Sequence, residues 1–372
     1  MYLNPTIKLL AILGVASVVS SCKSTSEPET SVEAKKIEVG RNIFFDTKLS
    51  NPVGQSCASC HSASTGFSDP NHAIVSEGAV SGLFGNRNAP SIGYASFTPL
   101  LHYDTTDSTW VGGLFLDGRV NTLEEQAKKP FLNHLEMNNT SVAMLASKLR
   151  AASYYPLFAE VFGTTASDDS VYEYIAQAIA AFERTSAFAQ FTSKYDYYLK
   201  GMATLSEQEM RGLRLFEDTA KGMCANCHIT TPDATSGKVL FTDFTYDNIG
   251  VPKNPNNPYY TLSANENPSG NNYIDRGLGP IVGQSESDGQ FKVPSLRNAA
   301  VSGPYFHNGY FSTLEEVVHW YNVRDSATAA GGFPPPEIEG NVNHEELGHL
   351  HLSPQEEADI VAFIKTLTDG YK

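Results

Sequence analysis

Two short stretches of sequence decide the fold of this chain: Cys57-Ala58-Ser59-Cys60-His61 and Cys224-Ala225-Asn226-Cys227-His228. Each stretch contains two cysteines separated by two residues and a histidine directly after the second cysteine, which is the pattern of a c-type haem attachment site. In such a site the two thiols add to the two vinyl groups of one haem, and the histidine ligates the iron. The sequence therefore predicts two covalently bound haem c groups. The predicted attachment cysteines and axial histidines are Cys57, Cys60, Cys224, Cys227, His61 and His228.

Two other interpretations of these four cysteines are open. Each pair could form a short-loop disulfide, or all four thiolates could bind one zinc ion. A zinc site of four thiolates does not require a histidine after each cysteine pair, whereas a haem site does. The repeated histidine therefore favours haem.

The N-terminal residues indicate export. Residues 1–21 contain Lys8 followed by an apolar run from Leu9 to Val19, which is typical of a secretory signal and too short to remain as a membrane span. The run ends in Val19-Ser20-Ser21-Cys22, which resembles a bacterial lipobox, where cleavage before the cysteine leaves a thiol that carries diacylglycerol. The alternative is an ordinary signal peptide with a spare cysteine.

A polar segment follows Cys22, so we expect residues 22–35 to form a lipidated flexible tether. The mature protein is then exported to the periplasmic side of a bacterial membrane. We expect the lipid anchor to be its only contact with that membrane.

The composition limits the classes of protein. The chain has 372 residues, of which 41% are hydrophobic and 18% charged, so it has enough apolar material for two ordinary cores. Its net charge of −15 provides no basic field that could hold nucleic acid. The same acidic charge is compatible with a basic redox protein as an electron donor.

The two haem motifs lie in similar surroundings. A helix predicted over 34–45 precedes the first motif, and a helix over 205–217, with Ser206 in a capping box, precedes the second. Each half also ends in an amphipathic helix, over 171–182 and over 360–367, where apolar residues recur at helical spacing. Long loops rich in Gly, Pro and Asn lie between these helices, and strand signals are scarce.

This arrangement predicts a mostly α-helical chain with two cytochrome c-like domains. Each domain carries one covalent c-type haem, and both have long irregular loops and few strands. We expect the domains to cover residues 36–195 and 196–372, with the boundary in the stretch 188–204.

Further motifs follow in a fixed order along the chain. They are Arg87-Asn-Ala-Pro-Ser91, Gly113-Leu-Phe-Leu-Asp-Gly-Arg119, Leu123-Glu-Glu-Gln126, Leu135-Glu-Met137, Phe291-Lys-Val-Pro-Ser-Leu-Arg-Asn298, Pro304-Tyr-Phe-His-Asn-Gly309 and Leu314-Glu-Glu-Val-Val-His-Trp-Tyr321. Together with the two haem motifs, this order resembles the bacterial di-haem cytochrome c peroxidase and MauG superfamily. The resemblance implies that the domain at 36–195 carries the peroxide-reacting haem. The domain at 196–372 then carries the haem that receives or stores electrons.

The resemblance places two candidate catalytic residues near the first haem, Gln126 and Glu136. To split a peroxide O–O bond, one side of the iron must be open, and an acid/base group must move a proton from the inner to the outer oxygen. Glu136 is suited to that proton transfer, and the amide of Gln126 is suited to orienting the bound oxygen. From the residues alone both could be surface side chains, because Gln126 lies in a helix opened by Thr122 and Glu125.

Some members of the family close the first haem with a distal histidine. The equivalent position here is Val80, and His72, the nearest alternative, has the wrong spacing and is expected to be a loop residue. We therefore expect an open, five-coordinate first haem that needs no reductive activation.

The second haem lacks the usual distal ligand of a high-potential cytochrome, because none of the six methionines follows His228. The family places this ligand at the position of Tyr321, which the helical spacing of Leu314, Val317 and Tyr321 turns inward. A core tyrosine is the alternative interpretation, and His319 is the second candidate ligand. A phenolate lowers the potential and stabilises high-valent iron, which resembles MauG more than the reductively activated peroxidases.

The family also holds a calcium ion between the haems with an asparagine side chain and two backbone carbonyls. The matching residues are Asn88, Ser302 and Pro304, and hard oxygen ligands of this kind suit Ca2+. The alternative for Asn88 is a turn residue before Pro90. Two roles are open for His307: a contact with haem propionates between the haems, or packing alone.

One residue departs from the family pattern. The family usually has a tryptophan between the haems in the segment that here reads Phe115-Leu116-Asp117, and a leucine cannot be oxidised. Trp110 and Tyr94 are near in sequence and could replace it. A stretch inserted at 98–111 could form a lid or a surface for a partner.

Three classes of function remain. The first is a di-haem peroxidase that reduces hydrogen peroxide to water with electrons from a small exported cytochrome c or copper protein, through the second haem. The second is a MauG-like oxidase that uses peroxide equivalents to oxidise a partner protein or an organic substrate. The third, a plain electron-transfer protein, is disfavoured by Gln126 and Glu136. A homodimer is left open.

Overall fold

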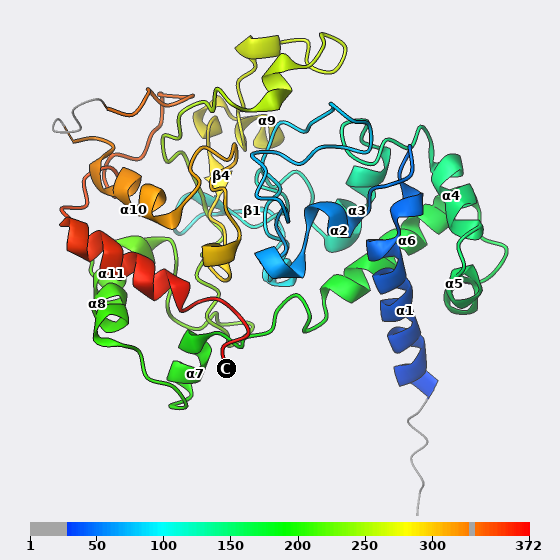
Figure 1. Cartoon of the computed structure of the whole chain (residues 1–372), viewed down its shortest axis with the longest axis horizontal. Helices are drawn as coiled ribbons and strands as arrows, with labels where there is room; N and C mark the ends of the chain where they lie inside the picture. The colour runs from blue at the N-terminus through cyan, green and yellow to red at the C-terminus, as the bar shows by residue number, and fades with distance from the viewer. Residues whose placement is uncertain (1–27, 327–331) are drawn as a thin grey trace, which may run out of the picture.

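The computed structural model describes residues 28–326 and 332–372, and Figure 1 shows how their helices and short strands are arranged. The predicted signal peptide and Cys22 lie outside the described residues. Within the described ranges the chain is rich in helices and has only four strands of two or three residues, so the predicted mostly helical fold with few strands is confirmed. The helices are α1 (Pro28–Phe45), α2 (Cys57–Cys60), α3 (Leu123–Leu132), α4 (Val142–Arg150), α5 (Tyr155–Phe162), α6 (Asp168–Glu183), α7 (Lys194–Leu199), α8 (Glu207–Glu217), α9 (Gly279–Val282), α10 (Leu314–Val323) and α11 (Pro354–Lys365). The strands are β1 (His102–Asp104), β2 (Thr109–Val111), β3 (Tyr246–Asp247) and β4 (Phe291–Lys292).

Helix α1 begins earlier than predicted. Residues 28–35 were expected in a flexible tether, but they belong to this helix, because the segment Glu33-Ala34-Lys35-Lys36 consists of good helix formers. Lys35 is also tied to Glu160 of α5 by an ion pair of 2.6 Å. The expectation of a flexible segment is therefore wrong for residues 28–35.

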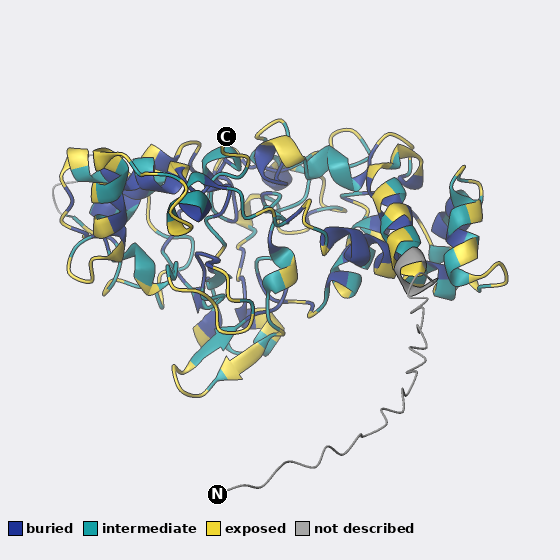
Figure 2. Ribbon diagram, turned by 90° about the horizontal axis from the view of Figure 1, so that it is seen from below, coloured by how far each residue is buried: buried dark blue, intermediate teal, exposed yellow. Residues whose placement is uncertain are grey.

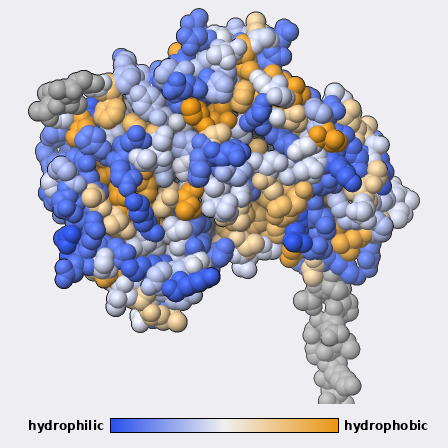
Figure 3. All heavy atoms as spheres, in the orientation of Figure 1, coloured by the Kyte–Doolittle hydropathy of each residue, from blue (hydrophilic) through white to orange (hydrophobic). Residues whose placement is uncertain are grey.

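None of the helices in the described part of the chain is long and apolar enough to cross a membrane. The face shown in Figure 3 is mostly hydrophilic, and hydrophobic side chains gather in patches, one of them in the middle of the molecule.

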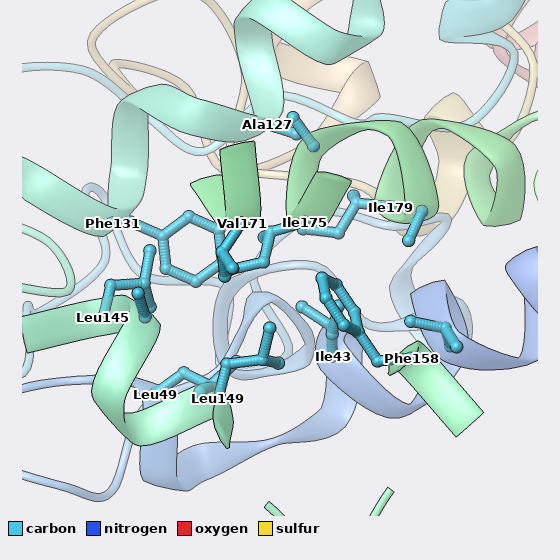
Figure 4. Close-up of a cluster of buried hydrophobic side chains, with 14 of the residues drawn as sticks. Ile43, Leu49, Ala127, Phe131, Leu145, Leu149, Phe158, Val171, Ile175 and Ile179 are labelled. Atoms are coloured by element: carbon cyan, nitrogen blue, oxygen red, sulfur yellow. The ribbon is translucent and has the colours of Figure 1, made fainter. Parts of the chain in front are cut away.

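The first half of the chain runs from α1 to α6. Its core lies between α1 and α6, and α3 and α4 pack on α6 at the right of Figure 1. The apolar stripe predicted for the closing helix of this half points into that core. Figure 4 shows the side chains that meet there: Ile43, Leu49, Ala127, Phe131, Leu145, Leu149, Phe158, Val171, Ile175 and Ile179.

Each half contains the same close contact between its opening and closing helices. Gly40 of α1 lies so near α6 that a Cβ atom on it would be 1.8 Å from the carbonyl oxygen of Ala178. In the second half, a Cβ atom on Gly212 of α8 would be 1.9 Å from the carbonyl oxygen of Asp359 of α11. Glycine at both positions therefore lets each pair of helices touch through their backbones.

A phenylalanine pair packs beside each of these contacts. The ring centroids of Phe44 and Phe182 lie 5.6 Å apart in the first half, and those of Phe216 and Phe363 lie 5.1 Å apart in the second. Both pairs are edge-to-face, the arrangement that aromatic rings prefer. The internal repeat seen in the sequence is thus also a repeat of packing.

The second half of the chain runs from α7 to α11, and its core lies around α8, α10 and α11. Tyr195 of α7 packs into this core, and Asp196 forms a buried ion pair with Arg297 at 3.0 Å. The predicted domain boundary between residues 195 and 196 falls inside α7, whose side chains contact the second half.

The inserted stretch at 98–111 forms an antiparallel hairpin of β1 and β2. Figure 2 shows the hairpin projecting from one side of the molecule. At its base Val111 pairs with Thr245, and the indole nitrogen of Trp110 donates a hydrogen bond of 3.1 Å to Gln284. The insertion therefore joins the first half to the second.

Candidate active site

The first haem motif forms the short helix α2, and His61 follows directly after it. The Nδ1 atom of His61 lies 3.0 Å from the carbonyl oxygen of Phe67. This hydrogen bond places the proton on Nδ1 and leaves Nε2 available to a metal. Burial lowers the pKa of His61, which keeps the imidazole neutral, as metal ligation requires.

His228 has the same arrangement in the second half. Its Nδ1 atom lies 2.9 Å from the carbonyl oxygen of Phe241, and burial lowers the pKa of His228 to about 4. Phe67 and Phe241 both adopt the left-handed backbone region, with φ of 64° and 55°, which is uncommon for a residue other than glycine. The two histidines are therefore held by the same local conformation.

In each half, a second loop bonds to the carbonyl group directly before the one that holds the histidine. Ser91 Oγ donates to the carbonyl of Gly66 at 2.5 Å, and Ser295 Oγ donates to the carbonyl of Leu240 at 2.6 Å. The accepting residues directly precede the two phenylalanines, and the serines lie in the similar sequences Pro-Ser-Ile and Pro-Ser-Leu. The support of the two histidines is thus repeated in sequence and in structure.

These groups fit a c-type haem. Neither cysteine pair is joined by a disulfide, and burial raises the pKa of all four thiols, that of Cys60 to about 11. Among residues 28–326 and 332–372, no three His, Cys, Asp or Glu side chains gather to hold a metal ion, so the four cysteines do not form the alternative zinc site.

The charge of Glu136 is among the causes that raise the pKa of both Cys57 and Cys60, so its carboxyl group is within electrostatic range of the first cysteine pair. Asn133 Nδ2 donates a hydrogen bond of 2.9 Å to Glu136 Oε1. Burial raises the pKa of Glu136, and the charge of Arg119 and the bond from Asn133 oppose this rise. A carboxyl group with a raised pKa at this place is suited to proton transfer.

The segment that contains Val80 packs on the turn that carries Glu136. The backbone nitrogen of Ala79 donates to the carbonyl of Glu136 at 2.7 Å. A Cβ atom on Gly78 would be 2.3 Å from the carbonyl oxygen of Leu135, so the two backbones touch. The side chain at position 80 is thus an apolar valine, and His72 is exposed, with Nδ1 bonded to the carbonyl of Gly303 in the second half at 2.7 Å.

Gln126 lies in the first turn of α3. This helix begins with the predicted capping box of Thr122 and Glu125. Gln126 is half-buried, and it lies four residues before Pro130, so both lie on the same side of the helix.

Helix α10 repeats α3 in the second half. Both helices follow a tight turn closed by one antiparallel bridge, and both begin with a Thr-Leu-Glu-Glu capping box. Pro130 and Tyr321 each lie eight residues beyond the N-cap threonine, so they occupy equivalent positions. Proline has no side-chain atom that could ligate iron, whereas tyrosine has a phenol oxygen.

Tyr321 lies near the second cysteine pair. Burial raises the pKa of its phenol, and the electrostatic influence of Cys227, Asp247 and Cys224 raises it further. On the same helix, the side chain of His319 is 55% exposed and its Nδ1 atom lies 3.1 Å from Glu357 Oε1. Of the two candidate ligands, Tyr321 faces the cysteines and His319 faces solvent.

Asn88 lies where the two halves meet, bonded to His307, which is three residues beyond Pro304. Its backbone nitrogen donates to the carbonyl of His307 at 2.8 Å. Its Nδ2 atom donates to the carbonyls of Ala73 and Ile74 at 3.2 and 3.0 Å. Because Nδ2 is used in this way, Oδ1 is the side-chain atom left to bind a cation.

His307 is buried and stacks on Phe291, with ring centroids 3.9 Å apart and planes inclined by 8°. Its Nε2 atom lies 3.7 Å from Glu337 Oε2, and neither atom has a hydrogen-bond partner among the described residues. The ring therefore packs on Phe291 and leaves Nε2 available to a further polar group.

The charged residues that join the two halves beside Glu136 were not predicted from the sequence. Arg87 pairs with Asp117 at 2.6 Å and with Asp275 at 2.7 Å, and Arg119 pairs with Asp117 at 2.9 Å. Lys292 is bonded to a backbone carbonyl of the first half, and burial lowers its pKa to about 7. Four of these five charges lie in the quoted motifs, but a single sequence does not show which charges face each other across the two halves.

Leu116 also lies where the halves meet, because its carbonyl accepts a hydrogen bond of 2.9 Å from the backbone nitrogen of Lys292. Trp110 lies in the projecting hairpin. Tyr94 is 3% exposed, and its hydroxyl donates a hydrogen bond of 2.6 Å to Asp369 near the end of the chain. Of the two aromatic residues that could replace the usual tryptophan, Tyr94 is the one buried between the halves.

The fold and the paired histidine sites define a c-type cytochrome with two haems, and comparisons with known proteins agree. Residues 34–204 match the family model described as di-haem cytochrome c peroxidase. The chain is 33% identical to the methylamine utilization protein MauG of Paracoccus denitrificans over 97% of this chain and 95% of that protein. It is 30% identical to the cytochrome c551 peroxidase of Nitrosomonas europaea over 98% of this chain and 91% of that protein.

Solved structures show the same likeness. The di-haem peroxidase BthA from Burkholderia thailandensis is 33% identical and has a TM-score of 0.79, covering 90% of this chain and 86% of that one. A MauG-like protein associated with microbial copper homeostasis is 31% identical, with a TM-score of 0.68, covering 90% of this chain and 89% of that one. The chain belongs to the family of di-haem cytochrome c peroxidases and MauG proteins, as the order of its motifs predicted. It is an oxidoreductase of the cytochrome c peroxidase type, and its family implies two haem c cofactors.

Proposed function

We propose that this protein reduces hydrogen peroxide to water with electrons that a small exported cytochrome c or copper protein delivers through its second half. One peroxide takes up two electrons and two protons and gives two water molecules. The observation that carries the proposal is Glu136, a carboxyl group with a raised pKa beside the first cysteine pair.

The cysteine pairs and their histidines are the proposed haem sites. Each histidine offers a free Nε2 atom because its Nδ1 atom is bonded to a backbone carbonyl. When bound, the haem iron supplies the place where peroxide is held and electrons are exchanged. The residues concerned are Cys57, Cys60 and His61 in the first half and Cys224, Cys227 and His228 in the second.

Glu136 moves the proton in the first half. It accepts the proton of the inner peroxide oxygen and returns it to the outer oxygen, which leaves as water. Asn133 holds Oε1 of Glu136, so Oε2 is the oxygen free to exchange that proton. Gln126 orients the peroxide with its amide, and Pro130 on the same side of α3 has no side-chain atom that could bind iron in place of the peroxide.

Tyr321 is the proposed second axial ligand in the C-terminal half. Its position near Cys224 and Cys227 supports this role, and the exposed position of His319 argues against the other candidate. An oxygen ligand lowers the haem potential, whereas methionine raises it.

This ligand also favours the second function, a MauG-like oxidase. A low potential in the second half favours the storage of oxidising equivalents over the delivery of electrons. Such an enzyme would use peroxide to oxidise a partner protein or an organic substrate.

Adding peroxide to the fully oxidised holoprotein, with and without a reduced small cytochrome c, distinguishes the two functions. Fast oxidation of the donor supports the peroxidase. Slow turnover together with a long-lived oxidised state of the protein supports the MauG-like oxidase. No consumption of peroxide under either condition would contradict both.

We also propose a calcium ion held by Asn88 Oδ1 and the carbonyl oxygens of Ser302 and Pro304. Two observations support this site: the bonds of Nδ2 leave Oδ1 to bind a cation, and the backbone bond to His307 holds Asn88 against the second half. Elemental analysis of the desalted holoprotein should find one calcium per chain, and Asn88→Ala should lose it. Equal calcium in both proteins would refute the ligand assignment.

Export and lipid anchoring remain proposals that rest on the sequence of residues 1–22. Expression of the full chain in a bacterium, followed by separation of the periplasmic and membrane fractions, tests both. The native chain should be in the membrane fraction, and Cys22→Ser should move to the soluble periplasmic fraction. A Cys22→Ser chain that stays in the membrane fraction would rule out the lipid anchor.

A further inference from the structure

The loops that support the two histidines meet each other at one carboxylate. Tyr94 and Asn298 hold equivalent places in these loops, since each lies three residues after the supporting serine. The hydroxyl of Tyr94 donates to Asp369 Oδ2 at 2.6 Å, and Asn298 Nδ2 donates to the same oxygen at 3.0 Å. Asp369 thus joins the histidine-supporting loop of the first half to that of the second.

Short paths lead from this carboxylate to each histidine. In the first half, the carbonyl of Phe67 that binds His61 also accepts a hydrogen bond of 3.2 Å from Ile92, two residues before Tyr94. The backbone nitrogen of Tyr94 donates at 2.9 Å to the carbonyl of Phe188, whose ring stacks on Phe67 with centroids 4.2 Å apart.

The path in the second half is closely similar. The carbonyl of Phe241 that binds His228 accepts a hydrogen bond of 3.3 Å from Leu296, two residues before Asn298. Between them lies Arg297, whose guanidinium carbon is 5.0 Å from the ring centre of Tyr94. Tyr94 is therefore placed between the two histidine sites, on the side where the histidines bind.

Leu116 and Tyr94 both lie at the contact of the halves, and they differ in redox chemistry. Leu116 has an aliphatic side chain that cannot give up an electron at biological potentials. Tyr94 is an oxidisable side chain at the contact of the halves, and its proton already has an acceptor. The Asp369 carboxylate also accepts hydrogen bonds from the backbone nitrogen of Thr192 at 2.9 Å and from Asn298 Nδ2 at 3.0 Å, so it is held in place beside the phenol.

We propose that Tyr94 is a redox-active relay between the two halves, with Asp369 as its proton acceptor. This inference rests on the proposed reaction with peroxide, which is the oxidant. When peroxide has oxidised the first half, Tyr94 gives it one electron, and its phenol proton moves along the hydrogen bond to the Asp369 carboxylate. A neutral tyrosyl radical and a carboxylic acid result. One electron from the second half then restores the phenol, and the proton returns from Asp369.

Arg297 does not make this oxidation costly. Its guanidinium group lies over the Tyr94 ring and donates two hydrogen bonds of 3.0 Å to Asp196. The negative charge of Asp196 therefore balances the positive charge of Arg297. Removal of the phenol proton to Asp369 also leaves no new charge on the ring.

The experiment uses freeze-quenched holoprotein, oxidised and then mixed with one equivalent of hydrogen peroxide. Electron paramagnetic resonance should show a tyrosyl radical, identified because its spectrum narrows in protein made with ring-deuterated tyrosine. Tyr94→Phe should lose this signal. Asp369→Asn, which keeps the phenol but not the proton acceptor, should also lose it or shorten its life.

Tyr154→Phe is the matched control, because the hydroxyl of Tyr154 also donates to a carboxylate, Asp46 Oδ2 at 2.8 Å, but within the first half alone. It should keep the signal. A tyrosyl signal that persists in Tyr94→Phe, or that disappears in Tyr154→Phe, would overturn the relay.

The optical spectrum recorded on the same samples separates this proposal from the proposed function. If peroxide changes the haem spectrum but no tyrosyl radical forms in the native protein, the relay is wrong and the reaction with peroxide stands. If peroxide leaves the spectrum of the native protein unchanged, the proposed function fails, and the relay fails with it.

Discussion

Pro130 of α3 and Tyr321 of α10 occupy the same position in two helices that begin with the same capping box and follow the same type of turn. The first residue offers no ligating atom, and the second offers a phenol oxygen close to a cysteine pair. The same local structure thus carries a side chain able to ligate iron in the second half and none in the first. This difference supports the proposal that peroxide binds in the first half and that the second half transfers electrons.

Replacing Tyr321 should change the second haem alone. We expect Tyr321→Met to raise its reduction potential by on the order of a few hundred mV, because a thioether ligand favours reduced iron and a phenolate ligand favours oxidised iron. Spectroelectrochemistry of the holoprotein measures both haems in one titration. The potential of the first haem should stay within the error of the measurement.

His319→Gln is the control for this experiment, since His319 is on the same helix but faces solvent beside Glu357. It should leave both potentials unchanged. If Tyr321→Met behaved like His319→Gln, Tyr321 would be a core residue and not a ligand.

The fold could be predicted to the extent that it depends on local signals. The capping boxes at Thr122, Ser206, Thr313 and Ser353 set the starts of their helices as expected, because each satisfies backbone groups within one turn. The early start of α1 was missed because helix formers in a polar segment give no periodic signal. The close contacts at Gly40 and Gly212 were also missed, since a glycine in a helix does not reveal which helix it touches.

Glu136→Gln should remove the proton transfer while both haems remain bound. An amide keeps the size and the hydrogen bond from Asn133, but it cannot accept a proton. We expect kcat/KM for peroxide to fall by about 10²- to 10⁴-fold, the usual contribution of a general acid–base group. Steady-state oxidation of a reduced small cytochrome c measures this, and pyridine haemochrome spectra confirm the haem content. Turnover equal to that of the native protein would remove Glu136 from the mechanism.

Arg119→Gln should shift the pH dependence of the reaction. Glu136 must be ionised to accept a proton, so kcat/KM falls as the pH drops through its pKa, which burial raises above the ordinary value. The positive charge of Arg119 opposes that rise. Its removal should therefore raise the pKa of Glu136 and move the fall in kcat/KM at acidic pH to a higher pH. Arg41→Gln, at an exposed site of α1, should leave the pH dependence of kcat/KM unchanged. If kcat/KM of Arg119→Gln fell at the same pH as that of the native protein, Arg119 would not act on Glu136.

The site could be predicted only in part because its residues come from segments far apart in the chain. The two cysteine–histidine motifs are contiguous, so their chemistry is readable from the sequence. Glu136 and Tyr321 needed the family pattern, since neither stands out by its neighbours. The network of Arg87, Asp117 and Asp275 required the structure, because its partners are brought together by the contact between the two halves.

The glycines of the two helix contacts provide a test of the repeat that is independent of catalysis. Gly40→Ala places a Cβ atom 1.8 Å from a backbone oxygen of α6, so the helices must separate. We expect a loss of unfolding free energy of about 1–3 kcal/mol or more. Gly212→Ala should cost a similar amount, because its Cβ atom would lie 1.9 Å from a backbone oxygen of α11.

Gly85→Ala is the matched control, since nothing lies within 4 Å of its Cβ position. Its effect on the free energy of unfolding should be within about 0.5 kcal/mol. Denaturant unfolding of the holoproteins, followed by the absorbance of each haem, measures all three variants. Because each contact lies within one half, Gly40→Ala should disturb the first haem before the second, and Gly212→Ala should reverse that order. Equal stability of Gly40→Ala and Gly85→Ala would mean that α1 and α6 do not touch through their backbones, and the structural equivalence of the two halves would lose its main support.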